Sequence, residues 1–113
     1  MRTLTILCAS LVVWTAGGCR REEPSSGGDE GARIYARACS SCHGMDGRGR
    51  PRMGLTTPPR DLTDPELYRN TNEAGLQQVV LHGKGQMPAF SKLLDEQEVR
   101  AVIGYLHTLQ RKP

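Results

Sequence analysis

The feature that most constrains the fold of this chain is a short cluster near its middle, Cys39-Ser40-Ser41-Cys42-His43. The chain has 113 residues, which suits one domain, and aromatic side chains make up only 4% of them. A domain of this size buries a modest share of its surface and usually needs disulfides, a metal or a cofactor. The cluster is therefore expected to hold a group around which the chain folds, and a large enzyme core is excluded.

The spacing of the cluster is typical of covalent attachment of a c-type haem. Cys39 and Cys42 stand nearly one helical turn apart, so their thiols can add to the two vinyl groups on one edge of a porphyrin. The imidazole of His43 then projects under the iron. The cluster predicts one haem c held by two thioether bonds, with His43 as the first axial ligand.

Three other chemistries use cysteines at this spacing. A thioredoxin-like redox pair needs a surrounding βαβ pattern, which the sequence lacks. Structural zinc needs four ligands in a tetrahedron, and neither His82 nor His107 has the usual spacing to a partner. A Cys39–Cys42 disulfide suits an oxidising compartment but leaves the core unfilled. The residues favour haem over all three.

A haem iron with both faces occupied needs a second axial ligand. The candidates are Met45, Met53, Met87, His82 and His107. Met45 is too close to His43 to reach the other face, and Met53 has no supporting motif. His82 suits the end of a helix, and His107 faces away from an apolar stripe. Met87 is the predicted ligand, because the glycines of its loop allow close approach to the ring and Pro88 stiffens the position.

The rest of the sequence predicts an all-α fold of three main helices and long loops. The expected elements are a helix from Asp29 to about Cys39, a turn of helix from Asp64-Pro65 to about Arg69, a helix capped by Asn72 and stopped by Gly83, and a last helix opened by a capping box of Asp95 and Glu98. Residues 44–62 and 83–91 are expected to be loops. No segment alternates as a strand does.

The first 18 residues predict a signal peptide of the lipoprotein type. A positive start precedes an apolar run at residues 4–16, which is shorter than the roughly 20 residues of a membrane-spanning helix. Small residues then lead to Cys19, which is the predicted site of lipidation. Plain signal cleavage and an uncleaved anchor are the alternatives. Cys8, inside the apolar run, is expected to be a simple apolar side chain.

Each of these alternatives exports the chain to the periplasm or the cell surface. Residues 19–28 are rich in Ser, Gly and charge, so they are expected to form a flexible tether between the lipid and a domain at residues 29–113. The predicted location is thus at a membrane, held through lipidated Cys19. The formal charge of +3 is mild and excludes nucleic acid as an expected partner.

With these motifs, the chain resembles a small bacterial class I cytochrome c over residues 29–110. The resemblance rests on Cys39–Gly44, on Met87-Pro88-Ala89-Phe90 and on Gly104-Tyr105-Leu106. It implies that the first and last helices cross at right angles. It also implies that a proline carbonyl, from Pro58 or Pro59, accepts a hydrogen bond from the imidazole of His43.

The helix crossing has its own residues in this family. Gly31 and Tyr35 match the positions on the first helix, and Val102 and Tyr105 match those on the last helix. A glycine on the first helix allows the two backbones to approach closely. An aromatic pair then packs beside the crossing.

The resemblance implies one-electron transfer between protein partners, as a free-standing carrier or as the cytochrome subunit of a respiratory complex, and no enzymatic activity. The basic side chains near the ligands would steer an acidic partner or form a solvated surface; they are Arg48, Arg50, Arg52, Lys84 and Lys92. Arg52 and Arg60 are candidates to pair with the haem propionates. The alternatives are a haem enzyme or gas sensor in which Met87 dissociates, and a haem-free zinc or disulfide module.

Overall fold

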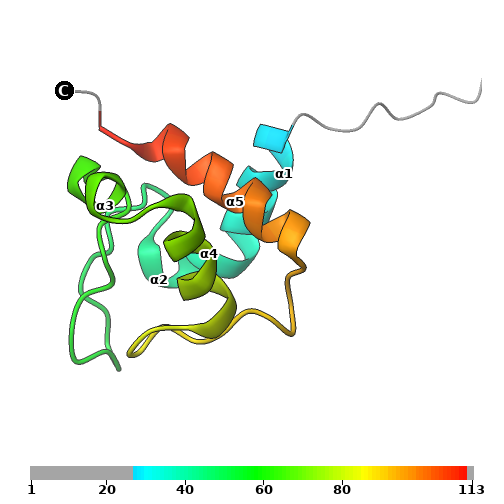
Figure 1. Cartoon of the computed structure of the whole chain (residues 1–113). Coiled ribbons are helices and arrows are strands. Elements are labelled where there is room, and N and C mark those ends of the chain that lie inside the picture. Colours follow the sequence, from blue (N-terminus) through cyan, green and yellow to red (C-terminus); the bar gives the residue numbers. More distant parts are fainter. Residues whose placement is uncertain (1–26, 112–113) are drawn as a thin grey trace, which may run out of the picture.

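Helices make up all the regular secondary structure in residues 27–111, the part of the chain described by the structure, a computed structural model (Figure 1). They are α1 (Gly27–Ile34), η1 (Tyr35–Cys39), α2 (Ser40–His43), α3 (Pro65–Asn70), α4 (Glu73–His82) and α5 (Glu96–Leu109). The predicted all-α class is confirmed. The signal peptide, Cys8, Cys19 and most of the predicted tether lie outside the described residues.

The first helical segment runs without a break from Gly27 to His43, but it is not uniform. Tyr35–Cys39 form a π-helical turn, in which the N–H of Ser40 donates to the carbonyl of Tyr35. The wider turn adds one residue to the helical repeat. Cys39 is thereby brought against the same core as Ile34. The sequence pattern predicted a regular helix from Asp29 to about Cys39. It did not predict the π turn or the continuation of the helix to His43.

The caps of the later helices follow the predicted signals. The side chain of Asp64 accepts from the N–H of Glu66 at the start of α3, and Asn72 accepts from the N–H of Gly75 at the start of α4. A complete capping box opens α5, because Asp95 and Glu98 each accept a hydrogen bond from the other's backbone. The predicted starts of these three helices are confirmed.

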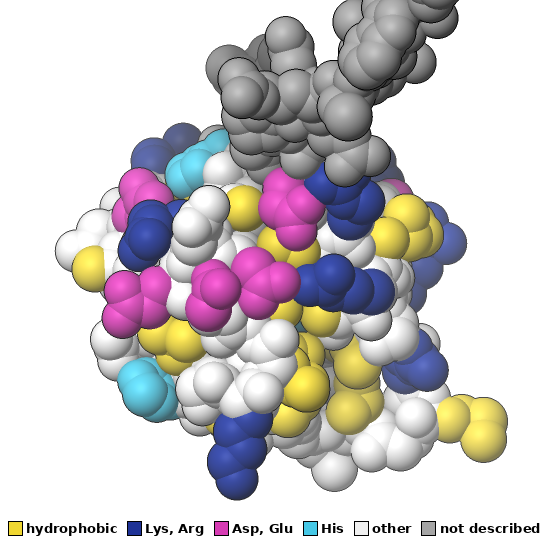
Figure 2. Space-filling view, turned by 90° about the vertical axis from the view of Figure 1, so that its right-hand side faces the viewer, with side chains coloured by type: hydrophobic (Ala, Val, Ile, Leu, Met, Phe, Trp, Pro, Cys, Tyr) yellow, Lys and Arg dark blue, Asp and Glu magenta, His cyan; other side chains and the backbone are white. Residues whose placement is uncertain are grey.

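Acidic residues occupy the first turns of the helices; in α1 and α5 they are Asp29, Glu30, Glu96 and Glu98. Carboxylates at these positions face the positive end of the helix dipole and so stabilise the helix. Figure 2, which views the molecule from the right-hand side of Figure 1, shows Asp and Glu side chains interleaved with Lys and Arg.

The core lies where α1 and η1 cross α5 (Figure 1). All four predicted apolar residues of α5 are buried: Val99, Val102, Ile103 and Leu106. A Cβ added to Gly31 would collide with the carbonyl oxygen of Ala101, so the crossing requires glycine there. The rings of Tyr35 and Tyr105 pack with centroids 5.3 Å apart. The aromatic pair and the glycine contact are therefore as the resemblance implied.

The two long loops leave the helices on the side away from this crossing (Figure 1). The fully buried Tyr35 donates its hydroxyl to the carbonyl of Gly44, 2.6 Å away, and so fixes the start of the 44–62 loop. Burial raises the pKa of this hydroxyl. The end of the same loop is fixed where the N–H of Leu62 donates to the carbonyl of Gly47. The loop is thus anchored at both ends while its middle extends beside the second loop.

Candidate haem site

One pocket brings together all four predicted haem-binding residues: Cys39, Cys42, His43 and Met87. Its empty space, including the open mouth, is about 1000 Å³. Most of the other lining residues are apolar; they are Ala38, Leu55, Pro58, Pro59, Leu62, Val80, Pro88, Phe90, Val102 and Leu106. A large concavity with apolar walls and a few polar groups is the usual form of a cofactor site.

His43 ends α2 and enters the pocket from the side of the 44–62 loop. Its Nδ1 lies 3.0 Å from the carbonyl oxygen of Arg60. A carbonyl can only accept, so Nδ1 carries the proton and the lone pair of Nε2 is left for a metal. Burial lowers the pKa of His43, although the bond to Arg60 opposes this, so the ring favours the neutral form that ligates metals.

The hydrogen-bond acceptor for the His43 imidazole differs from the one that was expected. The family resemblance implied the carbonyl of Pro58 or Pro59, whereas the structure has the carbonyl of Arg60. Pro59 instead packs over Gly49, where an added Cβ would collide with the Pro59 carbonyl oxygen. The Pro59 carbonyl thus lies against the Gly49 backbone, and the acceptor for His43 is the next carbonyl along the chain.

The two cysteines differ in exposure. Cys39 is half-buried against the core, and burial raises the pKa of its thiol to about 11, so the thiol is protonated at neutral pH. Cys42 is exposed at the edge of the pocket. Both are free thiols. No group of three or more His, Cys, Asp or Glu side chains that could hold a metal ion occurs within residues 27–111.

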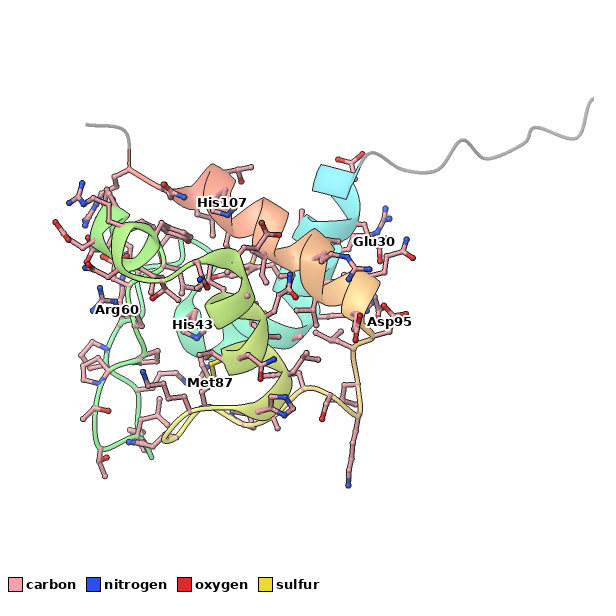
Figure 3. All side chains as sticks on the ribbon, in the orientation of Figure 1. Glu30, His43, Arg60, Met87, Asp95 and His107 are labelled. Carbon is pink, nitrogen blue, oxygen red and sulfur yellow. The ribbon has the colours of Figure 1, made fainter. Side chains whose placement is uncertain are left out.

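Met87 approaches from the opposite loop, on a tight hairpin. The backbone groups of Lys84 and Met87 exchange two hydrogen bonds of 3.1 and 3.0 Å. Gly85 has a φ of +58°, as the first central residue of such a turn requires. In Figure 3, His43 and Met87 lie between the 44–62 loop and α4. The hairpin holds the Met87 backbone rigid within its own loop.

The other candidates for the second axial position lie elsewhere. Met53 is fully exposed, and Met45 is 65% exposed in a separate shallow depression beside Cys42. His82 is exposed at the end of α4. His107 lies on the outer side of α5, where its ring packs on Tyr68 at 5.0 Å. Met87 alone among the five candidates lines the pocket.

The basic side chains near the pocket are partly neutralised. Asp46 pairs with Arg50 at 2.8 Å and with Arg48 at 4.0 Å. The N–H of Arg48 and the charges of both arginines lower the pKa of Asp46. Within residues 27–111, Arg52, Lys84 and Lys92 make no ion pair. The cationic groups left to steer an acidic partner are fewer than the sequence suggests.

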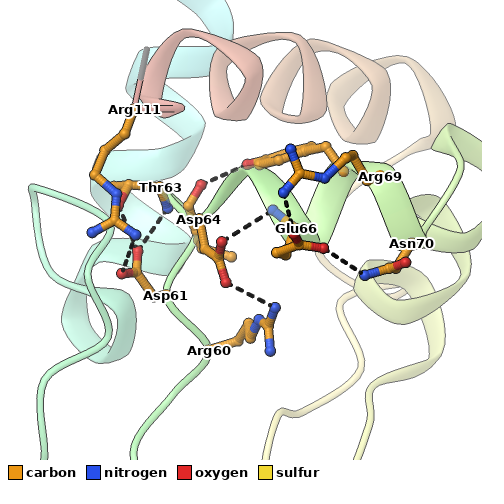
Figure 4. A network of polar contacts seen from close by, with 10 residues as sticks. Arg60, Asp61, Thr63, Asp64, Glu66, Arg69, Asn70 and Arg111 are labelled. Atoms are coloured by element: carbon orange, nitrogen blue, oxygen red, sulfur yellow. Dashed lines mark hydrogen bonds and ion pairs between the residues drawn. The ribbon is translucent and has the colours of Figure 1, made fainter. Parts of the chain in front are cut away.

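Arg60 takes part in a polar network beside the site (Figure 4). Its guanidinium lies 3.1 Å from a carboxylate oxygen of Asp64, the residue that caps α3. Asp61 accepts from the hydroxyl and N–H of Thr63 and pairs with Arg111 at 3.6 Å. The network ties the end of the 44–62 loop to α3 and to the chain beyond α5. It engages Arg60, one of the two predicted propionate partners.

Sequence reasoning missed two polar groups at the site. One is the carbonyl of Arg60, since a backbone acceptor leaves no mark in the residue type. The other is the side chain of Gln86, which lines the pocket and bonds to Thr56 and Thr57 across it. A lone glutamine before a methionine carries no signal of such a contact.

Comparison with known proteins agrees with this geometry. Residues 27–106 match the family model described as "Cytochrome C oxidase, cbb3-type, subunit III". The chain is 35% identical over 80 residues to the cbb3-type cytochrome c oxidase subunit FixP of Bradyrhizobium sp. (strain ORS 278), covering 70% of this chain and 26% of that protein. It is also 35% identical over 81 residues to subunit CcoP of Cereibacter sphaeroides, covering 71% and 27%.

The fold has a similar solved structure. The c-type cytochrome KustC0563 superposes with a TM-score of 0.61 at 26% identity, covering 72% of this chain and 98% of that one. The chain spans about a quarter of the length of the curated relatives it matches. The match to the family model and this likeness agree with the pocket in one conclusion: the chain belongs to the cytochrome c family of cbb3-type oxidase subunit III, whose members carry covalently bound haem c.

Proposed function

We propose that this chain is an exported one-electron carrier that binds one c-type haem between its two long loops. The observation that carries the proposal is that the CxxCH cysteines, His43 and Met87 line one apolar pocket. The sequence has a single CxxCH cluster, which supports one haem per chain. The bound haem would supply a ferric–ferrous couple, with its potential raised by a thioether ligand.

Each residue of the site has a distinct task in this proposal. Cys39 and Cys42 would hold the haem through two thioether bonds, each formed by addition of the thiol S–H across a vinyl double bond. The bond from Nδ1 to the Arg60 carbonyl fixes the ring of His43, which would leave Nε2 free to bind the iron. Met87 would supply the second iron ligand. The apolar walls of the pocket would exclude water and so favour the less charged ferrous state of a bound haem.

If His43 and Met87 both bind the iron, they would leave no open position on it for a substrate. The chain would therefore pass electrons without making or breaking substrate bonds, which separates it from a haem enzyme or a gas sensor. Cys42 lines the pocket and is exposed, so a haem edge held there would be open to solvent for electrons to enter and leave.

The partners are redox proteins, and the relatives suggest their kind. Proteins similar to this chain are named as subunits of cbb3-type cytochrome c oxidase. This chain would work as the cytochrome component of a respiratory complex or as a separate carrier that delivers electrons to one.

The proposed location is the periplasm or the cell surface, with the domain held at a membrane. Residues 1–18 would be removed, lipid would be attached to Cys19, and residues 19–28 would tether the domain. Within residues 27–111, no helix has both the length and the apolar character to cross a membrane. Lipidation would be tested by mass spectrometry of the membrane fraction, with the variant Cys19→Ser as the control.

The haem assignment is tested by producing the chain in a host competent in c-type haem attachment. The proposal predicts a mass increase of one haem, a low-spin ferrous spectrum, and negligible binding of carbon monoxide at neutral pH. Ready carbon monoxide binding would favour the open-iron alternative. A colourless protein of unmodified mass would contradict both and leave a haem-free module.

A further inference from the structure

One side chain, Gln86, makes the hydrogen bonds that join the two loops walling the pocket within residues 27–111. The 44–62 loop carries the acceptor for His43, and the 83–91 loop carries Met87. In the same part of the chain, no backbone hydrogen bond joins these two loops. The backbone of the 83–91 loop instead pairs with itself at Lys84 and Met87 and bonds to α4. The distance between the two loops therefore depends on contacts made by side chains.

Gln86 supplies these contacts with both ends of its amide. Its Oε1 accepts from the backbone N–H of Thr56 at 3.0 Å. Its Nε2 donates to the hydroxyl of Thr56 and, at 3.5 Å, to that of Thr57. Two-point contact by one amide fixes orientation as well as distance. Gln86 thus fastens the 83–91 loop to the 44–62 loop at the mouth of the pocket.

The backbone of the loop that Gln86 fastens is bonded to itself and to α4, where the N–H groups of Phe90 and Ser91 donate to the carbonyls of Val80 and Leu81. A tie to the 44–62 loop must therefore come from a side chain. Gln86 directly precedes Met87, so a tie at its side chain limits the movement of the next residue. At its other end the tie holds Thr56, in the loop whose Arg60 carbonyl orients His43. One amide therefore links the supports of both predicted axial ligands.

We propose that Gln86 is a positioning residue that holds Met87 on the haem iron and slows its dissociation. The inference rests on the proposed function, since it needs Met87 to be a ligand. Gln86 does not touch the iron in this account. It acts by fixing the loop against Thr56, and its loss would make the sixth position labile without removing the ligand.

The test measures how fast an external ligand replaces methionine in the ferric protein. At saturating imidazole, the replacement rate approaches the rate at which Met87 leaves. Gln86→Ala removes both amide contacts and is expected to speed replacement about tenfold, which corresponds to ~1.4 kcal/mol. Gln86→Glu keeps an acceptor for the Thr56 N–H and hydroxyl, so it is expected to retain a rate close to that of the wild type. Gln78→Ala, an exposed glutamine on α4, is the matched control.

A variant of Thr56 tests the same contact from the other loop. Thr56→Val removes the hydroxyl but keeps the N–H bond to Oε1, so it is expected to give a smaller acceleration than Gln86→Ala. Combining the two changes should add little to Gln86→Ala alone, because they remove the same contact. Additive effects of the two changes on the replacement rate would show that Gln86 and Thr56 do not act through a shared contact, and would overturn the inference.

The outcomes separate this inference from the proposed function. A wild-type protein with the long-wavelength methionine-to-iron band supports the proposed ligand. If that band is present and Gln86→Ala replaces methionine at the wild-type rate, the positioning role is wrong while the proposed function stands. If the wild-type protein lacks the band, both are overturned. Circular dichroism of each variant checks that the helices are intact.

Discussion

The crossing of α1 with α5 and the pocket between the two loops differ in what fills them. At the crossing, side chains and backbone meet directly: Gly31 lies against the Ala101 carbonyl, and Tyr35 packs on Tyr105. In the pocket, apolar residues from five segments (η1, the 44–62 loop, α4, the 83–91 loop and α5) face about 1000 Å³ of space. Protein atoms fill the space between the helices at the crossing, whereas the apolar walls of the pocket would pack on a bound cofactor.

This difference teaches where the aromatic residues of a small domain are needed. With so few of them, the chain places two tyrosines at the helix crossing, while the pocket wall has one aromatic hydrocarbon side chain, Phe90, among aliphatic residues and prolines. A porphyrin would supply a large flat apolar body for these walls to pack on. We therefore expect the crossing to be sensitive to single methyl groups, and the folded chain as a whole to need the haem.

The largest effect is expected from removing the attachment points. Cys39→Ala combined with Cys42→Ala would prevent covalent attachment, and the apolar walls of the pocket would have nothing to pack against. The expected result is a largely unfolded chain, measured by far-ultraviolet circular dichroism and thermal melting. A cooperative, well-folded apoprotein would show that the pocket walls do not need the cofactor.

One added methyl group is expected to destabilise the helix crossing. Gly31→Ala puts a Cβ into the Ala101 carbonyl, and overpacking of this kind costs about 1–3 kcal/mol. Denaturant unfolding of the haem-loaded protein measures the loss. The iron spectrum should keep its ligands, because Gly31 lies away from the pocket. An unchanged free energy of unfolding would mean that the helices separate at no cost.

Removing the predicted sixth ligand should change the iron site and spare the helix crossing. Met87→Ala is expected to leave the helix crossing intact and to lower the midpoint potential by ~60 mV or more, a tenfold change in the one-electron equilibrium. Redox titration measures the shift, and Met45→Ala is the matched control because Met45 lies outside the pocket. An unchanged potential and spectrum in Met87→Ala would assign the ligand to another residue.

The change with the smallest expected effect tests whether the requirement for glycine is specific to Gly31. Gly104 lies on α5, the other helix of the crossing, but a Cβ there would have no heavy atom within 4 Å. Gly104→Ala should stabilise the protein by about 0.5–1 kcal/mol, through reduced chain entropy in a helix. The measurement is the same denaturant titration. A destabilisation similar to that of Gly31→Ala would show that the helix contacts extend around to Gly104.

The features that could be predicted from the sequence are those that the residue type at a position indicates directly. The capping box of Asp95 and Glu98, the apolar face of α5 and the contact at Gly31 all have local signals, and the structure has them. The grouping of Met87 with the CxxCH cluster followed from its glycine-rich loop. These signals are short in range and depend on side-chain chemistry.

The features that were missed depend on backbone geometry or on distant loops. The π turn at Tyr35–Cys39 cannot be told from a regular helix by the spacing of apolar residues alone. The acceptor for His43 is the Arg60 carbonyl, which any residue could have supplied. The contact of Gln86 with Thr56 joins positions 30 residues apart with no pattern linking them.

The central claim is that Met87 and His43 hold one haem iron between the two loops. Proton NMR of the ferrous protein, with isotope-labelled methionine methyl groups, tests it most directly. A methyl group bound above the porphyrin is shifted strongly upfield by the ring current. The account predicts one such signal, absent in Met87→Leu and retained in Met45→Leu and Met53→Leu. A signal that survives in Met87→Leu, or no shifted methyl in the wild-type protein, would contradict it.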